Sequence, residues 1–168
     1  HSQTEQILTR IAKASPHDVW HKIAWYLGPP IDSRAFRIKQ WLRDGGLTFM
    51  PADEVWKWID ADLEERAWYA ATFVPSALET GAGDTSWARE LLVRFGDRKD
   101  VRSNLHANLS TEMWTGPESS HYQGKKRWVE DLRKKETNPN VLRFIDEFID
   151  SLSHRIEAAR IEEERRGF

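Results

Sequence analysis

Apolar residues recur at intervals of three and four along almost the whole chain, without the sustained alternation of apolar and polar positions that is typical of strands. A helix turns once in about 3.6 residues, so this spacing places the apolar side chains on one face of each helix. The pattern predicts an all-α protein of about eight to ten helices. The predicted helices lie around residues 7–12, 19–27, 35–42, 55–59, 63–74, 87–95, 101–113, 128–132 and 141–159.

Proline, glycine and small polar residues mark where these helices begin and end. Ser15-Pro16 supplies a cap and a first helical position, and Asn138-Pro139 does the same for the last and longest helix. The polar stretch from Thr115 to Gly124 predicts a turn-rich interruption that begins around Gly116-Pro117. Further predicted stops are Gly28-Pro29-Pro30, Gly45-Gly46, Pro75, Gly81-Ala82-Gly83 and Gly96.

Four helix openings share a valine behind an acidic residue or an asparagine. They are Asp18-Val19, Glu54-Val55, Asp100-Val101 and Asn140-Val141, and their valines are 36, 46 and 40 residues apart. Some two-helix repeats have periods of about 40 to 47 residues, and each pair must stack on its neighbours to bury its apolar face. The spacing therefore predicts a short array of antiparallel helix pairs.

Two of these openings carry a family resemblance. The segments Arg98-Lys-Asp-Val-Arg-Ser-Asn-Leu105 and Asn138-Pro-Asn-Val-Leu-Arg-Phe144 resemble the openings of second helices in HEAT repeats. The resemblance implies a HEAT-like α-solenoid with a right-handed superhelical arrangement, in which the acidic residue or Asn caps the helix and the valine enters the core. Trp20 and Trp56 depart from this pattern, because the family usually has Arg there. The block from Leu91 to Arg165 further resembles the C-terminal helical regions of large bacterial multidomain proteins, some of them NTPase-type defence proteins.

The charge balance argues against a broad surface for nucleic acid or membrane. Lys and Arg number 25 and Asp and Glu number 27, which gives a formal net charge of −2. The chain has no cysteine, which excludes disulfides, thiolate nucleophiles and cysteine-based zinc sites and fits a reducing cytoplasm. No apolar run reaches the length of about 18 residues that a membrane helix needs. We expect a cytoplasmic protein that binds neither nucleic acid nor membrane.

The length of 168 residues suits a single helical-repeat domain, residues 1–168. His1 and Ser2 stand where an initiator methionine would be, so we interpret residues 1–2 as a tag remnant or the edge of a fragment. We expect the domain to be the C-terminal part of a larger protein. Its expected partners are the other domains of that protein or a separate protein.

Nine tryptophans are many for a chain of this length, and most of them are predicted to lie in the core. Trp25, Trp58 and Trp68 lie off the strictest apolar stripes. They are therefore candidates for the walls of an aromatic groove, and the alternative is ordinary, partly buried packing.

The main candidate for a binding face is the segment from Trp114 to Arg127. It combines two aromatic rings, a carboxylate, an imidazole and three cations, a set that suits an anion or a peptide. If this is a binding face, replacing Tyr122 and Arg127 with alanine should leave the melting temperature nearly unchanged. The alternative is a capped turn in which Glu118 and Ser119 satisfy helix donors and His121 rests on Trp114. The candidate residues are Trp114, Glu118, His121, Tyr122, Lys125, Lys126 and Arg127.

The sequence marks no catalytic residue, cofactor or metal site. His17 and His21 have the i, i+4 spacing that can hold a divalent metal, but no third ligand is marked and Asp18 suits a helix start. Ser119 and His121 are near neighbours without the turn pattern that frames a serine nucleophile.

The sequence therefore favours a non-catalytic helical-repeat module that packs against other domains or a protein partner. The alternative is an enzyme resembling HEAT-like DNA glycosylases. Such an enzyme would need a concave basic channel, aromatic walls and a carboxylate beside the cationic transition state. The chain has the aromatics and carboxylates but no excess of basic residues.

Overall fold

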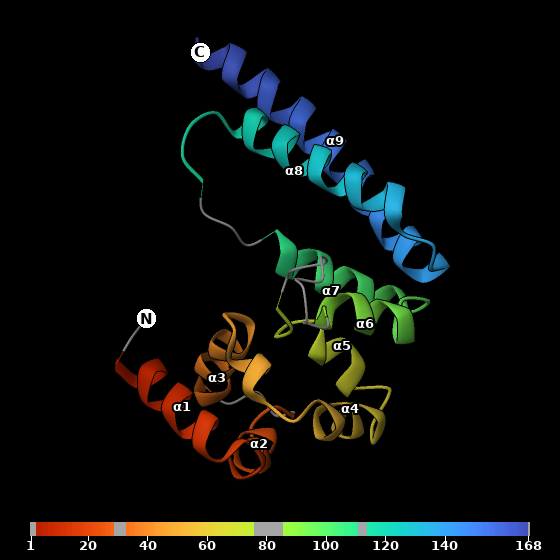
Figure 1. The fold of residues 1–168 in the computed structure, drawn as a ribbon. Coiled ribbons are helices and arrows are strands. Elements are labelled where there is room, and N and C mark those ends of the chain that lie inside the picture. Colours follow the sequence, from red (N-terminus) through yellow and green to blue (C-terminus); the bar gives the residue numbers. More distant parts are fainter. Residues whose placement is uncertain (1–2, 29–32, 76–85, 111–113, 168) are drawn as a thin grey trace.

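A computed structural model describes residues 3–28, 33–75, 86–110 and 114–167 of the chain (Figure 1). Every regular element in these ranges is a helix, which confirms the all-α prediction. The predicted stops at Pro29-Pro30 and Gly81-Ala82-Gly83, and the helix end near Met113, lie outside the described residues. The elements are α1 (Gln3–Ala14), α2 (Pro16–Ala24), α3 (Ser33–Arg43), the 3₁₀ helix η1 (Gly46–Phe49), α4 (Ala52–Asp60), α5 (Arg66–Ala70), α6 (Trp87–Phe95), α7 (Lys99–Leu109), α8 (Glu118–Lys135) and α9 (Pro139–Arg166).

Local sequence signals determine several helix ends. Pro16 and Pro139 occupy the first turns of α2 and α9, where the missing proline N–H leaves no intrahelical bond unmade. The Asn138 side chain accepts hydrogen bonds from two backbone N–H groups of the first turn of α9, at 3.0 and 3.3 Å. Ser15 occupies the cap position of α2 but its side chain makes no capping bond there.

The α8 helix begins at Glu118, so the prediction of a turn-rich stretch as far as Gly124 is wrong. Pro117 occupies the cap position and has no side-chain oxygen to offer the first turn. The acceptor comes instead from α9, where the Glu163 carboxylate accepts bonds from the Ser119 N–H at 2.9 Å and the Ser119 hydroxyl at 2.6 Å. Polar residues can therefore open this helix, because a distant carboxylate satisfies its first donors.

The apolar stripe predicted for the first helix is mostly not buried. Ile7 and Ile11 are 51% and 50% exposed, whereas Ala12 is buried and Leu8 is partly buried. The main contacts of α1 are with α2 and η1, and they bury Ala12 while leaving the Ile7 and Ile11 side chains half exposed. Leu63, which was predicted to begin a buried stripe, precedes α5 and is also exposed.

The principal contacts link most of the helices into one series. The α1 helix packs on α2, α2 on α4, α4 on α5, α5 on α7, α7 on α6, α6 on α9 and α9 on α8. Figure 1 shows the result, with α1 to α3 at one end of the molecule and the α8–α9 hairpin at the other. Across the described ranges, no helix is both long enough and apolar enough to cross a membrane.

One hydrophobic core runs through these contacts. The four opening valines, Val19, Val55, Val101 and Val141, are all buried in it, as the sequence predicts. The largest fully buried side chains in the described ranges include Phe73, Phe144 and Phe148. The tryptophans divide between core and surface, with Trp20, Trp41, Trp56 and Trp87 buried.

The α8–α9 hairpin is anchored on α6 at the end where α8 turns into α9. Arg89 of α6 donates two hydrogen bonds to the Glu136 carboxylate, at 2.8 and 3.0 Å. The Asn140 side chain donates to the Val93 carbonyl at 3.3 Å. Gly96 permits the close approach, since a Cβ at this position would lie 2.9 Å from the Asn140 Cβ. This end of the hairpin is therefore held by charge, hydrogen bonding and close packing together.

A second set of contacts joins the hairpin to α7. Arg102 is buried on α7 and donates to the Glu147 carboxylate of α9 at 2.9 Å. The same guanidinium donates to the carbonyls of Gly96 and Asp97 after α6, each at 2.9 Å. A single side chain thus ties together three helices near the anchored end of the hairpin.

Candidate functional site

The structure brings three of the predicted aromatic and imidazole groups together at the start of α8. The Trp114 indole stacks on the His121 ring, with 4.7 Å between centroids and 11° between planes. Tyr122 lies beside both rings, at 5.8 Å from Trp114 and 5.4 Å from His121. The indole remains 40% exposed. The stack that sequence reasoning offered as the structural alternative is therefore present, and its outer aromatic residue faces solvent.

Tyr122 itself is not a surface residue of this segment. Only 9% of it is exposed. Its hydroxyl donates to Glu118 at 2.9 Å, and the Arg155 guanidinium of α9 lies 5.6 Å from its ring centre. Burial, followed by the bond to Glu118, raises the pKa of Tyr122. Tyr122 packs α8 against α9, and its replacement with alanine should lower the melting temperature.

Lys125 joins α8 to the end of α7. Its Nζ donates to the Leu109 carbonyl, one of the last carbonyls of α7, and lies 5.8 Å from the Phe148 ring centre. A cation is favourable at a helix C-terminus, where the unpaired carbonyls carry partial negative charge. The Lys125 side chain therefore links α8 to the C-terminal end of α7.

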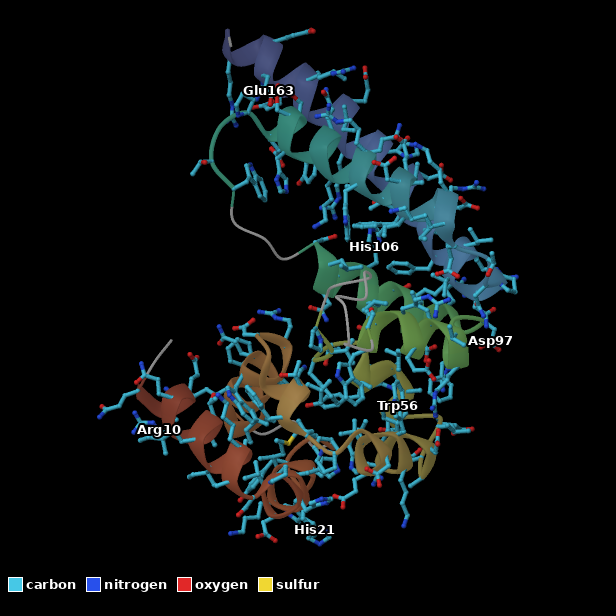
Figure 2. All side chains as sticks on the ribbon, viewed as in Figure 1. Arg10, His21, Trp56, Asp97, His106 and Glu163 are labelled. Carbon is cyan, nitrogen blue, oxygen red and sulfur yellow. The ribbon has the colours of Figure 1, made fainter. Side chains whose placement is uncertain are left out.

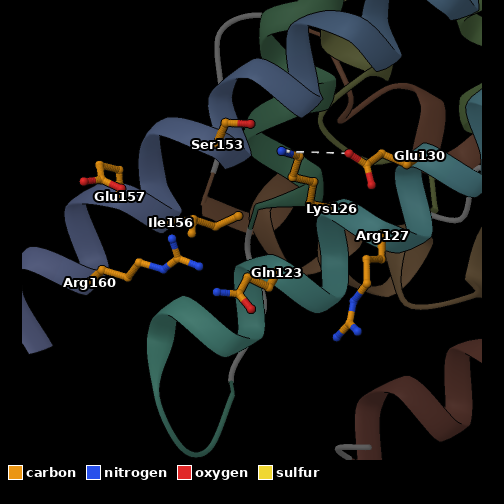
Figure 3. A pocket seen from close by; sticks show the side chains of 8 residues that line it. All are labelled: Gln123, Lys126, Arg127, Glu130, Ser153, Ile156, Glu157 and Arg160. Carbon is orange, nitrogen blue, oxygen red and sulfur yellow. Dashed lines mark ion pairs between the residues drawn. The ribbon is translucent and has the colours of Figure 1, made fainter.

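Lys126 and Arg127 lie on a different face of α8, in a shallow groove against α9. Lys126 approaches Glu130 at 3.8 Å, and Figure 3 shows the Arg127 guanidinium directed away from this pair. The structure therefore does not gather all seven predicted residues on one face. The groove has a volume of about 400 Å³ and is lined by Gln123, Lys126, Arg127, Glu130, Ser153, Ile156, Glu157 and Arg160.

A second groove lies along α8 on the face that carries His121. The space beside Gly124 is open, because a Cβ added there would meet no atom of another element within 4 Å, and a larger side chain would project into it. A glycine inside a helix costs about 1 kcal/mol relative to alanine, so this opening comes at the expense of helix stability. The groove has a volume of about 510 Å³ and is lined by Ser120, His121, Gly124, Lys125 and Trp128.

Ser120 and Gly124 lie within the predicted segment but were not predicted as individual binding residues, and Trp128 lies beyond it. Gly124 was predicted to lie in a turn, whereas it lies inside α8, and Trp128 is partly buried. The three positions are four residues apart and share one side of a helix, which is the signal that could have found them.

The three tryptophans proposed as groove walls occupy separate surroundings. Trp58 of α4 packs against the core, 6.0 Å from Trp20. Trp68 also packs against the core, 5.7 Å from the Tyr69 ring. For these two, partly buried packing is what the structure shows. Trp25 at the end of α2 is 85% exposed, and its role as a groove wall stays a prediction.

His17 and Ser119 each contact a carboxylate of another helix. The Nδ1 atom of His17 lies 2.6 Å from the Glu54 carboxylate of α4, which raises the pKa of His17. No cluster of three histidine or acidic side chains able to hold a metal occurs in the described ranges. The Ser119 hydroxyl donates to Glu163, and this bond lowers the pKa of the Glu163 carboxyl. Ser119 is therefore oriented toward α9.

Because His121 both stacks on the exposed Trp114 and lines the groove beside Gly124, we treat these residues as one candidate surface, which we call the Trp114 face. It is defined by Trp114, Ser120, His121, Gly124 and Trp128. The chain matches no protein-family model, and comparisons with curated proteins and with solved structures found no match.

Proposed function

We propose that this chain is a non-catalytic, HEAT-like helical-repeat module that binds a protein partner, or another domain of a parent protein, through the Trp114 face. In such an array each helix pair packs on its neighbours, and the rigid stack presents extended surfaces for binding.

The order of helix contacts supports the repeat architecture. The buried valines lie near the starts of α2, α4, α7 and α9, which would be the second helices of four successive pairs. Three of these pairs, α1/α2, α6/α7 and α8/α9, are in direct contact. In the remaining pair, η1 is inserted between α3 and α4 and packs on α3, and α5 follows as an additional short helix between α4 and α6.

The exposed Trp114 indole is the observation that carries the proposed binding role. A surface indole that makes no contacts loses rotamer freedom when a partner binds it. The Trp114 side chain is already held in one orientation by stacking on His121, so its binding costs less entropy. Large aromatic side chains supply much of the binding energy at protein interfaces when a partner excludes water from them. The groove beside Gly124 offers a partner side chain a place to insert next to the indole.

A peptide library displayed on phage tests this proposal with a defined probe. Peptides enriched on the parent protein should bind Trp114→Ala at least about tenfold more weakly, which corresponds to about 1.4 kcal/mol. Gly124→Leu should weaken the same peptides by filling the groove. Trp25→Ala is the matched control, because it removes an exposed indole on a distant helix and should leave binding unchanged.

The stability of each variant is measured by circular dichroism before binding is compared. Trp114→Ala should melt close to the parent, since it removes one half-exposed ring rather than a core residue. Equal peptide affinity for the parent and for Trp114→Ala would overturn the proposed face. Failure to enrich any peptide above a non-binding scaffold would overturn it as well.

A further inference from the structure

His106 lies where α7 meets the α8–α9 hairpin (Figure 2). Its ring stands edge-on to Phe148 of α9, with 4.8 Å between centroids and 82° between planes. Its Nε2 atom is buried and has no hydrogen-bond partner among the described residues. A buried nitrogen without a partner is costly even when the ring is neutral, and more costly when a proton is added to it.

The charges around His106 are predominantly positive. Lys125 reaches it from α8 and Arg155 from α9, while α9 also presents the Glu147 carboxylate. Glu147 is also bonded to Arg102, and its attraction for a proton on His106 is weaker than the repulsion from Arg155. Helices α5 and α6 also pack near α7, but within the described ranges they bring no charged group to bear on His106.

A proton on His106 would therefore place a third cation beside two others and leave a buried N–H without an acceptor. Burial lowers the pKa of His106, and the repulsion from Arg155 and Lys125 lowers it further against the weaker attraction of Glu147. When the hairpin moves away, water can reach the ring and the two cations separate from it. The proton thus favours the arrangement in which the hairpin is not docked on α7.

The other end of the hairpin does not respond in the same pH range. The Arg89–Glu136 pair holds it to α6, and Arg89 together with backbone donors lowers the pKa of Glu136 to about 2. That anchor stays charged between pH 5 and pH 8, a range in which histidine titrates. Figure 1 shows the hairpin close to α6 at this end and diverging from α7 toward the C-terminal end of α9.

We propose that the α8–α9 hairpin is a proton-sensitive arm, docked on α7 while His106 is neutral and swinging about its anchor on α6 when His106 takes up a proton. This device does not depend on the proposed binding role of the Trp114 face. Because the pKa of docked His106 lies below its ordinary value of 6.5, docking is favoured above that pH. Docking weakens as the pH falls from there toward the pKa of the docked ring.

The absence of cysteine from the chain makes a direct distance measurement possible. Cysteines introduced at the exposed positions Ser103 of α7 and Ala158 of α9 carry spin labels for pulsed electron paramagnetic resonance. At pH 8 the labels should show one distance population. Below pH 6.5 a second population with a longer distance should grow. The ratio of undocked to docked molecules should rise by up to about tenfold per pH unit until the docked ring itself titrates.

Two variants keep the proposal falsifiable if one of them folds poorly. His106→Phe retains an aromatic ring and His106→Gln a polar side chain, and neither can be protonated, so both should abolish the longer population. His17→Gln and His154→Gln are controls on exposed histidines and should preserve it. Circular dichroism at the same pH values should show unchanged helix content.

Three results would overturn the proposal. The first is an unchanged distance distribution between pH 8 and pH 5.5. The second is a longer population that persists in both His106 variants. The third is a distance change that coincides with loss of helical signal, because this would indicate unfolding rather than motion of an intact hairpin.

Discussion

Alanine substitutions at two glycines should change stability in opposite directions. Gly124 lies inside α8 with no atom within 4 Å of an added Cβ, so alanine there should gain helix propensity without a clash. The expected gain is about 0.5 to 1 kcal/mol. At Gly96 an added Cβ would lie 2.4 Å from the Leu92 carbonyl oxygen and 2.9 Å from the Asn140 Cβ. Overpacking of this kind costs about 1 to 3 kcal/mol, because α9 must move away from α6.

These free energies correspond to measurable shifts in melting temperature. For a domain of this size, 1 kcal/mol changes the melting temperature by about 2 to 4 °C. Thermal and urea unfolding followed by circular dichroism should therefore place Gly124→Ala a few degrees above the parent and Gly96→Ala several degrees below it. A destabilised Gly124→Ala would refute the assignment of residue 124 to the interior of an exposed helix. A Gly96→Ala variant as stable as the parent would refute the close contact between α6 and α9.

Three further predictions concern the core, the anchor and nucleic acid. Val101→Asp and Val141→Asp should each lower the free energy of unfolding by about 3 to 5 kcal/mol, measured in urea, because each would bury a charge; parent-like melting would contradict the helix register. The bond to Arg89 lowers the pKa of Glu136, so this pair stabilises the fold fully above about pH 4.5 and loses its contribution as the pH falls toward 2. Arg89→Met should therefore be less stable than the parent at neutral pH, and acid titrations should show this difference shrinking between pH 4.5 and 2. With a labelled DNA duplex at physiological salt, fluorescence anisotropy should give a Kd no lower than the range of non-specific association, about 1 to 100 μM, because the net charge is −2. Tight, steeply salt-dependent binding, or release of a base, would instead support the glycosylase alternative.

Helix content and many helix ends could be predicted because their causes are local. The 3.6-residue period reports which side of a helix is apolar, and Pro16 and Asn138-Pro139 act within one turn of the helices that they open. The burial of Val101 and Val141 follows from the same periodicity. Each of these features depends on residues that are close together in the sequence.

The features that the sequence did not predict depend on distant partners. The start of α8 requires Glu163, which is 44 residues away from Ser119, so no local pattern marks it. Ile7 and Ile11 form an apolar stripe as regular as the buried ones, yet periodicity does not reveal whether a second element covers a stripe. Tyr122 was predicted to be an exposed binding residue because its neighbours in the sequence are polar. The groups that bury it include residues of α9, such as Arg155, which are distant in the sequence.

The same distances have a consequence for the order in which the protein matures during synthesis. Chain synthesis proceeds at about 5 to 20 residues per second, so Ser119 exists for several seconds before Glu163 is made. During that interval the first N–H groups of α8 lack their carboxylate acceptor. The stack of Trp114 on His121 stands directly at this unfinished helix end. A nascent chain would therefore complete the helix pairs that precede α8 first, and it would acquire the Trp114 face only after the last turns of α9 have left the ribosome.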